Sequence, residues 1–331
     1  MSMGPIVILG GGPAGLSAGL WLKNLGLAAV VLERQSQPGG MQNLNFLDNN
    51  WVLGQAGVTG QELGRRFRDH ARSAGVDIRL NVTVTGLAPG PGRSIELELD
   101  NGPPLACAAL VIATGTRFNG LEVLGDILAR IPPLAPEQAA CGPYAFQDLV
   151  AQAGRHVVIV GGGDNAYENA RLLLDVGATV TVVIRSRPRA QQQMLAAVTN
   201  RPGCTTLQDS RISAVAATPL GLNLELRTPW GKEMVAADRL HILAGYRPNT
   251  DFLVDLLPNA WQPLLRRDAA GYMTVDAWGR TDIAGVYAVG DVCNPDFPSV
   301  VSALAQGAKT AKAIERDLRE SPSNFPLFSC K

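Results

Sequence analysis

Apolar and polar residues alternate early in the chain in a way that predicts a strand, a helix and a second strand. Pro5–Leu9 is a short apolar run rich in isoleucine and valine, and glycines 10–12 follow it directly. Residues 14–25 then carry apolar side chains at helical spacing, and Ala28–Leu32 is apolar again, with Glu33 at its end. Short apolar runs are typical of buried parallel strands, so this stretch is expected to form a βαβ unit.

The same pattern returns about 150 residues later. His156–Val160 is followed by glycines 161–163, by Asp164–Leu174 with helical spacing, and by the apolar run Ala178–Ile184. The other expected elements are a helix over residues 59–73 opened by the capping box Thr59-Gly60-Gln61-Glu62, strands near Asp77–Leu80, Val82–Leu87, Ser94–Asp100, Ala109–Ala113, Leu240–Ala244 and Val286–Val289, and a last helix over Val300–Leu318. Strands that alternate with helices in this way predict the α/β class.

Length and composition narrow the possibilities further. At roughly 150 residues per domain, 331 residues suggest two domains, and 46% apolar with 18% charged residues fits a well-packed α/β protein. The 29 basic and 29 acidic residues cancel, so we expect no nucleic-acid partner, and no membrane partner is expected either. The three histidines are scattered without metal-ligand spacing, so no metal is expected. Five scattered cysteines suggest reduced thiols in a cytoplasmic protein.

The first glycine run has the spacing of a dinucleotide-binding turn. Gly10, Gly12 and Gly15 follow a strand and open a helix, which permits a tight turn and a close approach of the backbone to a diphosphate. Glu33 lies 18 residues after Gly15, where a carboxylate can accept hydrogen bonds from a ribose. The alternative is a glycine-rich turn that holds no ligand.

The second run, Gly161-x-Gly163-x-x-Ala166, differs from the first in the residues beyond its helix. The position that corresponds to Glu33 is Ile184, which is not an acid, and arginines stand at 185, 187 and 189. A missing acid with guanidinium groups nearby favours a 2′-phosphate, and so NADPH over NADH. The alternative is a solvated basic turn.

Several motifs in the same order resemble the low-molecular-weight thioredoxin reductase family and its relatives over nearly the whole chain. They are Gly10–Gly15, Pro38-Gly39-Gly40, Asn50-Trp51, Thr59-Gly60, Ala113-Thr114-Gly115, Gly161–Ala166, Gly245–Thr250 and Gly285–Asp291. The resemblance implies two Rossmann-like, three-layer ββα nucleotide-binding domains, with the NAD(P)H domain (119–246) inserted into the FAD domain (1–118 and 247–331). It also implies a homodimer, and hydride transfer from NADPH to FAD with electrons passing to a separate acceptor.

The resemblance also names the expected binding residues. For FAD they are Gly10, Gly12, Pro13, Ala14, Gly15, Glu33, Arg34, Gly40, Met41, Asn50, Val84, Ala113, Thr114, Gly115, Gly290 and Asp291, whose carboxylate in the family bonds the ribityl chain. For the nicotinamide nucleotide they are Gly161, Gly163, Asp164, Asn165, Ala166, Arg185, Arg187 and Arg189.

The departures from the family concern the electron acceptor. The family's reductases carry a CxxC pair shortly before the second glycine turn, and here that region holds Cys141 alone. The segment Tyr144–Leu149 instead resembles ferredoxin–NADP reductases that lack the pair, so ferredoxin or flavodoxin is the expected acceptor. Met41 stands where the family usually has Gln, Pro298-Ser299 replaces an Arg-Gln pair, and Ser186 interrupts the basic pair.

Three alternatives stay open at this stage. Cys141 or Cys293 is a candidate catalytic thiol in a disulfide reductase with a thioredoxin-like partner, or a small packing residue. The chain could also be a flavin-binding relay that does not react with NAD(P)H. Phe325 and Phe328 either stack on the flavin ring, or pack on a dimer partner, or do not pack at all.

Overall fold

The first apolar run lies at the centre of a five-stranded parallel sheet. β1 (Ile6–Leu9) pairs with β2 (Ala29–Glu33) on one side and with β7 (Ala109–Ile112) on the other. β3 (Asp77–Leu80) and β18 (Val286–Ala288) complete the order β18-β7-β1-β2-β3. This computed structural model describes residues 4–91, 94–143 and 146–320.

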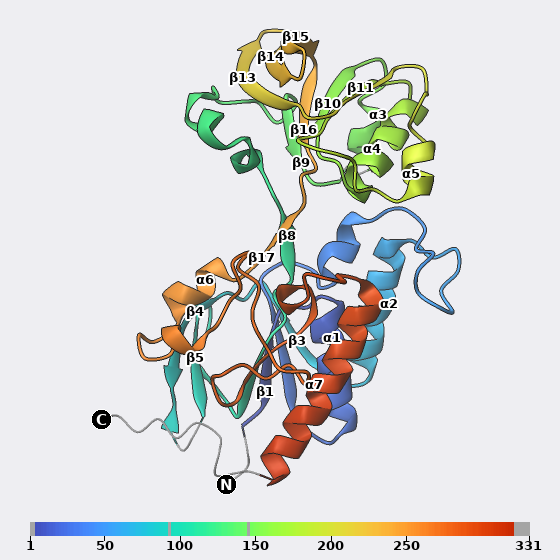
Figure 1. Cartoon of the computed structure of the whole chain (residues 1–331). Helices are drawn as coiled ribbons and strands as arrows, with labels where there is room; N and C mark the ends of the chain where they lie inside the picture. Colours follow the sequence, from blue (N-terminus) through green and yellow to red (C-terminus); the bar gives the residue numbers. More distant parts are fainter. Residues whose placement is uncertain (1–3, 92–93, 144–145, 321–331) are drawn as a thin grey trace. The chain divides into compact units, whose positions relative to one another are not determined.

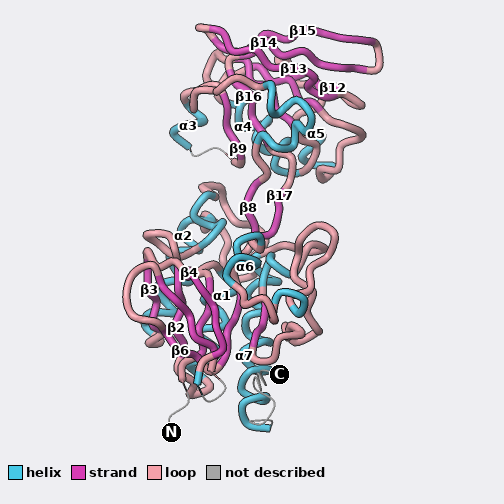
Figure 2. The backbone as a smooth tube through the Cα atoms, turned by 90° about the vertical axis from the view of Figure 1, so that its left-hand side faces the viewer, coloured by secondary structure: helices cyan, strands magenta, loops and turns pink. Residues whose placement is uncertain are grey.

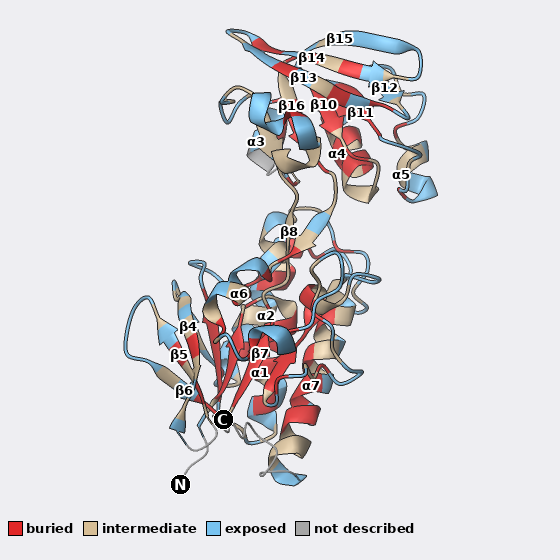
Figure 3. Ribbon diagram, turned by 60° about the vertical axis from the view of Figure 1, so that its left-hand side comes forward, coloured by how far each residue is buried: buried red, intermediate tan, exposed pale blue. Residues whose placement is uncertain are grey.

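Two different layers cover the faces of this sheet (Figure 1). Successive strand residues point to opposite faces, so Ile6 and Ile8 pack with α1 (Pro13–Asn24) and α7 (Val300–Glu320), whereas Val7 packs on the other side. The antiparallel strands of that other side are β4 (Val84–Pro89), β5 (Ile95–Leu99) and β6 (Leu105–Cys107). The result is a helix layer, a parallel sheet and a smaller antiparallel sheet, with buried residues along the central strands (Figure 3).

The helix α2 (Gly60–Ser73) begins as the capping pattern predicts. Thr59 is the N-cap, and its hydroxyl accepts a hydrogen bond from the backbone nitrogen of Glu62 at 3.2 Å. The Glu62 side chain pairs with Arg65 and Arg66.

The second glycine run belongs to a separate sheet with the order β12-β11-β10-β16-β9. Its strands, all parallel, are β9 (Ala139–Cys141), β10 (His156–Val160), β11 (Thr179–Val183), β12 (Cys204–Leu207) and β16 (Arg239–Ile242). The helix α4 (Asp164–Asp175) connects β10 to β11 as expected. The other face of the sheet packs against the antiparallel sheet of β13 (Arg211–Thr218), β14 (Gly221–Thr228) and β15 (Gly231–Ala237).

The three-layer ββα architecture implied such an antiparallel layer, but its strands were not located in the sequence, although they carry a readable signal. Leu222, Leu224 and Leu226 alternate with polar residues along β14 and are buried. Such alternation is typical of a strand with one buried face. The predicted α/β class with two Rossmann-like domains is confirmed.

Two short strands connect the two compact units of the chain. One unit contains residues up to Arg117 and from Arg247 onward, and the other is Phe118–Tyr246. The connecting strands, β8 (Thr116–Phe118) and β17 (Tyr246–Pro248), pair with each other, and they run side by side in Figure 2. The domain that interrupts the first unit is therefore entered and left at adjacent points.

The remaining elements are short. They are η1 (Gly40–Leu44), η3 (Leu121–Arg130), α3 (Phe146–Val150), α5 (Gln192–Ala196), α6 (Asp251–Leu256), η4 (Gln262–Leu264) and η5 (Gly290–Cys293). None of the helices in the described part of the chain has the length and apolar character needed to span a membrane.

Candidate nucleotide-binding sites

Two glycines of the first turn are required by the fold itself. Gly10 has φ +108°, and a Cβ there would lie 2.4 Å from the backbone oxygen of Ala113. A Cβ on Gly15 would lie 2.0 Å from the backbone oxygen of Gly10. Neither position has space for a side chain, so these glycines let the turn close between the ends of β1 and β7 and the start of α1.

Gly12 has a different environment, because the space beside it is open. The nearest atom to a Cβ at Gly12 would be the Cα of Gly40, 3.9 Å away. Gly12 is also the N-cap of α1, where no side chain caps the helix, and Pro13 occupies the first turn. Free first-turn N–H groups beside an open space suit an anion such as a diphosphate.

The acid expected to bind a ribose lies against this turn. Glu33 is buried at the end of β2; its Oε2 accepts from the backbone nitrogen of Gly11 and its Oε1 from that of Gln35, both at 2.8 Å. Each carboxylate oxygen has a second lone pair that a hydroxyl group could use. Arg34, the next residue, is exposed.

Three further predicted segments converge on the same turn. Gly40 lies beside it, since a Cβ on Gly40 would be 3.1 Å from the Cα of Gly12. Thr114 follows Ala113 and is fixed by its hydroxyl, which donates to the backbone oxygen of Asn249 at 2.8 Å. Gly290 touches the first turn of α1, because a Cβ there would lie 2.7 Å from the Cβ of Ala14.

The side chain of Asp291 fits a hydroxyl-bearing ligand most clearly. Its Oδ1 is buried, and no described residue forms a hydrogen bond with it. Burial raises the pKa of this carboxyl group to about 6. Buried polar atoms are nearly always bonded, so this oxygen fits the ribityl hydroxyl that the family resemblance predicts. The residues present therefore fit FAD.

The other predicted FAD residues are less central. Met41 is half-buried in η1, and Gly115, after β7, has φ +63°. Val84 begins β4 and packs among the apolar residues between the parallel sheet and the antiparallel sheet of β4, β5 and β6. Asn50 is exposed, whereas its neighbour Asn49 is buried and accepts from the backbone nitrogen of Trp51 at 3.0 Å.

Two glutamines near these segments were not predicted from the sequence. The side-chain oxygen of Gln42, next to Met41, is buried without a hydrogen-bond partner among the described residues. The oxygen of Gln306 in α7 accepts from the backbone nitrogen of Gly290 at 2.7 Å and so holds the segment of Asp291. The bond between Gln306 and Gly290 can be known only from the tertiary structure. Gln42, by contrast, directly follows Met41 in the sequence, and its position next to a predicted FAD residue was a usable signal.

The second glycine turn repeats the geometry of the first. A Cβ on Gly161, which has φ +152°, would lie 2.3 Å from the backbone oxygen of Leu243. At Gly163, by contrast, a Cβ would meet no atom within 4 Å, and Gly163 is the N-cap of α4 without a side-chain cap. Ala166 is fully buried in the first turns of α4. An open space again lies at the start of a helix, which suits a second diphosphate.

The loop after β11 that carries Arg185, Arg187 and Arg189 is called the arginine loop here. Three hydrogen bonds attach it to the second glycine turn. The backbone nitrogen of Arg189 donates to the backbone oxygen of Gly162 at 2.7 Å. Asp164 accepts from the backbone nitrogen and the side-chain amide of Gln191 at 2.8 and 2.9 Å. The carboxylate of Asp164 thus holds the loop, while the amide of Asn165 donates to the hydroxyl of Tyr246.

The three arginine side chains are available at the surface. Arg185, Arg187 and Arg189 are exposed, and none forms an ion pair within the described residues. Guanidinium groups without carboxylate partners, next to an anion-binding turn, suit an additional phosphate.

Neither candidate thiol lies in an environment that favours the thiolate. Burial, with a smaller contribution from Asp291, raises the pKa of Cys293 to about 12, and its Sγ donates to the backbone oxygen of Gly290 at 3.4 Å. Cys141, at the end of β9, is exposed, and partial burial together with Glu122 raises its pKa. A nucleophilic cysteine needs a lowered pKa.

Two earlier expectations fall on parts that the structure does not describe. Tyr144 and Ala145, and the side chains of Phe146 and Gln147, lie outside the described residues, as do Phe325 and Phe328.

Comparison with known proteins identifies the family of this chain. The model of the pyridine nucleotide-disulphide oxidoreductase family matches residues 4–307. The chain belongs to this family. The resemblance to thioredoxin reductase-like proteins is thereby confirmed.

Two relatives and one solved structure show the range of similarity. The chain is 28% identical over 316 residues to an alkyl hydroperoxide reductase subunit of Pseudomonas putida, covering 93% of this chain and 57% of the relative. It is 26% identical over 331 residues to thioredoxin reductase of Coxiella burnetii, covering 95% and 96%. The crystal structure of Lactococcus lactis thioredoxin reductase in its FR conformation gives a TM-score of 0.80 at 24% identity, covering 95% and 98%. The chain thus spans little more than half of some curated relatives, and its fold matches the solved reductase.

Proposed function

We propose that this chain is an FAD-dependent oxidoreductase that takes electrons from NADPH and passes them to a separate small redox protein, with ferredoxin or flavodoxin as the first choice. One observation carries the proposal: two glycine turns each leave an open space at an uncapped helix start, at Gly12 and at Gly163. A chain with a single dinucleotide would need one such turn, and two suit a flavin nucleotide and a pyridine nucleotide.

FAD bound at the first turn would supply the redox chemistry, which side chains alone do not provide. The residues of the chain bind and orient it. The first turn of α1 would hold the diphosphate, Glu33 would accept from the adenosine ribose, and the buried oxygen of Asp291 would accept from the ribityl chain. Gln306 holds the backbone of Gly290 and so keeps Asp291 in position.

NADPH is preferred to NADH in this proposal because of the loop after β11. Ile184 replaces the acid that would bind a ribose 2′-hydroxyl, and Arg185 and Arg187 are exposed and unpaired with carboxylates in the described residues. The hydrogen bonds of Asp164 and Arg189 attach this loop to the glycine turn, so the arginines are held near a bound nucleotide.

The acceptor is proposed from the thiols. The five cysteines do not form a CxxC pair, and the pKa values of Cys141 and Cys293 are raised, so a dithiol relay has no support within this chain. One-electron carriers such as ferredoxin and flavodoxin require no thiol. A cytoplasmic homodimer completes the proposal.

A disulfide reductase is the second candidate, because relatives such as the Coxiella burnetii protein are named thioredoxin reductases. It would have to use Cys141 or Cys293 singly, or a thiol supplied by a partner.

The test is anaerobic mixing of the FAD-containing protein with NADPH and, separately, with NADH, while the flavin absorbance is followed. We expect NADPH to bleach the flavin at a lower concentration than NADH. Ferredoxin, flavodoxin and thioredoxin are then offered to the reduced protein, and reoxidation by either of the first two supports the proposal. An oxidised spectrum that persists with both nucleotides identifies a relay protein, and reoxidation by thioredoxin alone identifies a disulfide reductase.

A further inference from the structure

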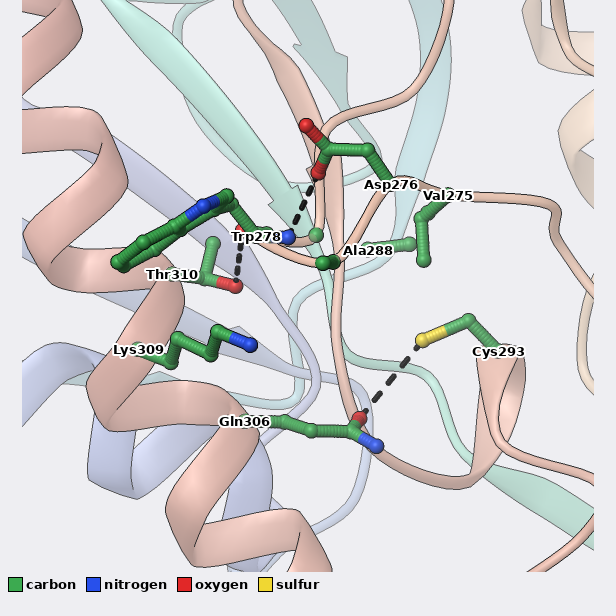
Figure 4. Close-up of a pocket in the computed structure, with 10 residues that line it drawn as sticks. Val275, Asp276, Trp278, Ala288, Cys293, Gln306, Lys309 and Thr310 are labelled. Carbon is green, nitrogen blue, oxygen red and sulfur yellow. Dashed lines mark hydrogen bonds between the residues drawn. The ribbon is translucent and has the colours of Figure 1, made fainter.

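A cavity of about 350 Å³ lies in the first unit, at the edge of its central sheet and outside the residues proposed to hold FAD. β18 is the edge strand there, and the segment before Arg280 and the helix α7 form opposite walls (Figure 4). The lining residues are Val275, Asp276, Ala277, Trp278, Gly279, Ala288, Cys293, Gln306, Lys309 and Thr310. A space of this size is at the lower end of the range for small-molecule sites.

Lys309 supplies a positive charge to this cavity. Figure 4 shows its side chain extending from α7 toward the space between Gln306 and Trp278. Its Nζ lies 5.2 Å from the centroid of the Trp278 ring, and it forms no ion pair with a carboxylate in the described part of the chain. The guanidinium of Arg316 lies over the same ring at 4.8 Å. A cation held over an aromatic ring, with no carboxylate neutralising it, can pair with an anion.

Gln306 adds a neutral hydrogen-bond donor. Its Oε1 already accepts from the backbone nitrogen of Gly290 at 2.7 Å and faces the Sγ of Cys293 at 3.8 Å. The hydrogen bonds thereby fix the orientation of the amide, and its NH₂ group is left to donate.

The carboxylate of Asp276 does not offset these donors. It accepts from the backbone nitrogens of Trp278 and Arg280 at 2.7 and 2.9 Å, and from the Arg280 guanidinium at 3.1 Å. Arg280 also pairs with Asp317 at 2.6 Å. Of the two charged residues that line the cavity, Asp276 is thus paired with Arg280, whereas Lys309 has no carboxylate partner among the described residues.

The rest of the wall is apolar. Val275, Ala288 and the Trp278 ring contribute carbon surface, and the thiol of Cys293 is protonated because burial and Asp291 raise its pKa to about 12. Trp278 is 37% exposed, so its ring is reachable from solvent. Because the Cys293 thiol stays protonated, it contributes a packing surface to the cavity and is not a site of covalent attachment.

We propose that this cavity binds a small organic carboxylate with an apolar body, whose charge pairs with Lys309 and Gln306 and whose apolar part contacts Val275, Ala288 and the edge of Trp278. The size of the cavity favours a small ligand, and the single lysine in its wall favours one negative charge. Because Gln306 also holds Gly290, the occupant would contact a residue that positions the proposed flavin segment.

The test is isothermal titration calorimetry of the full-length, FAD-containing protein with benzoate and with benzamide, its uncharged analogue of the same shape. We expect benzoate to bind one per chain, and benzamide to bind at least tenfold more weakly because it lacks the charge. Lys309→Met is expected to weaken benzoate binding about tenfold or more. Lys312→Met, an exposed lysine on the same helix that pairs with Glu315, is the matched control and should leave binding unchanged.

Gln306→Glu provides a second variant that does not depend on removing a charge from the surface. A glutamate keeps an oxygen for the Gly290 nitrogen but replaces the NH₂ donor with a negative oxygen, so benzoate binding should be lost. The proposal is overturned if benzoate gives no saturable heat, if benzamide binds equally well, or if Lys309→Met binds benzoate as the parent does. This readout needs no turnover, so it stands apart from the proposed electron transfer.

Discussion

The Oε2 atom of Glu33 lies 2.8 Å from the backbone nitrogen of Gly11, a residue 22 positions earlier in the chain. The bond joins the end of β2 to the turn after β1, so the acid expected near a ribose and the turn expected near a diphosphate are fixed relative to each other. The other oxygen accepts from the nitrogen of Gln35 at 2.8 Å, and the side chain is buried.

We therefore expect Glu33→Gln to lower the free energy of unfolding of the flavin-free protein by about 1–2 kcal/mol, because one charge-assisted hydrogen bond is lost. FAD affinity should fall as well. Urea unfolding and titration with FAD measure the two effects. Glu137→Gln, at an exposed position, is the control; equal stability of both variants would show that the Gly11 bond does not contribute.

The glycines of the first turn should separate into those needed by the fold and those needed by the ligand. Gly15→Ala is expected to destabilise the flavin-free protein by about 3 kcal/mol or more, because its Cβ would lie 2.0 Å from a backbone oxygen. Gly12→Ala should change the free energy of unfolding by about 1 kcal/mol or less and yet weaken FAD binding at least tenfold, since its Cβ would occupy the open space. Urea unfolding and FAD titration distinguish these outcomes, and unchanged FAD affinity in Gly12→Ala would place the diphosphate elsewhere.

The arginine loop should determine nucleotide preference. Replacing Arg185 and Arg187 together with Gln is expected to lower kcat/KM for NADPH about ten- to hundredfold, with little change for NADH, because only NADPH carries the 2′-phosphate. Steady-state kinetics with both nucleotides measure this. Arg227→Gln, an exposed arginine in β14 of the same unit, is the control. Equal losses with both nucleotides would argue that the loop acts on folding or general binding.

Asp291 should make the flavin-free protein less stable as the pH rises. Its pKa is about 6 in the folded protein against 3.8 in the unfolded chain, so the folded state holds the extra proton between these values. The stabilisation is complete below pH 3.8 and is lost as the pH rises through 6, with a difference of about 3 kcal/mol. Asp291→Asn should remove this loss, which would make the flavin-free protein more stable than the parent at pH 8 while weakening FAD binding.

Urea unfolding of both flavin-free proteins at pH 4 and pH 8 tests this sign. The parent and Asp291→Asn should differ at pH 8 and converge toward pH 4. A difference that grows on acidification would contradict the assignment of a raised pKa to this group.

The cysteines should be dispensable for electron transfer to ferredoxin or flavodoxin. Cys141→Ser and Cys293→Ser are each expected to keep kcat within about twofold of the parent, because neither thiol ionises near neutral pH. Alkylation with iodoacetamide at pH 8, followed by peptide mapping, should leave Cys293 unmodified in the folded protein. Loss of turnover in either variant would favour the disulfide-reductase alternative.

The local sequence predicted the elements whose signal is contained in a short stretch of chain. The first helix was expected over 14–25 and is Pro13–Asn24, and the second strand–turn–helix was located from its apolar run, its glycines and the helical spacing that follows them. Both turns could be recognised because a backbone with positive φ, as at Gly10 and Gly161, requires glycine at fixed positions between an apolar strand and a helix.

The tertiary structure decided what depends on residues far apart in the chain. The spacing showed three glycines in the first turn, but only the packing of Gly10 against Ala113 separates those that the fold requires from Gly12, which leaves room for a ligand. Likewise, nothing near Gln306 in the sequence indicates its bond to Gly290 or the cavity beside Lys309. The sequence by itself determined which segments form the two glycine turns between a strand and a helix, because those rules are local. Burial, and with it the raised pKa values of Asp291 and Cys293, was decided by tertiary contacts, because desolvation depends on neighbours that only the folded chain brings together.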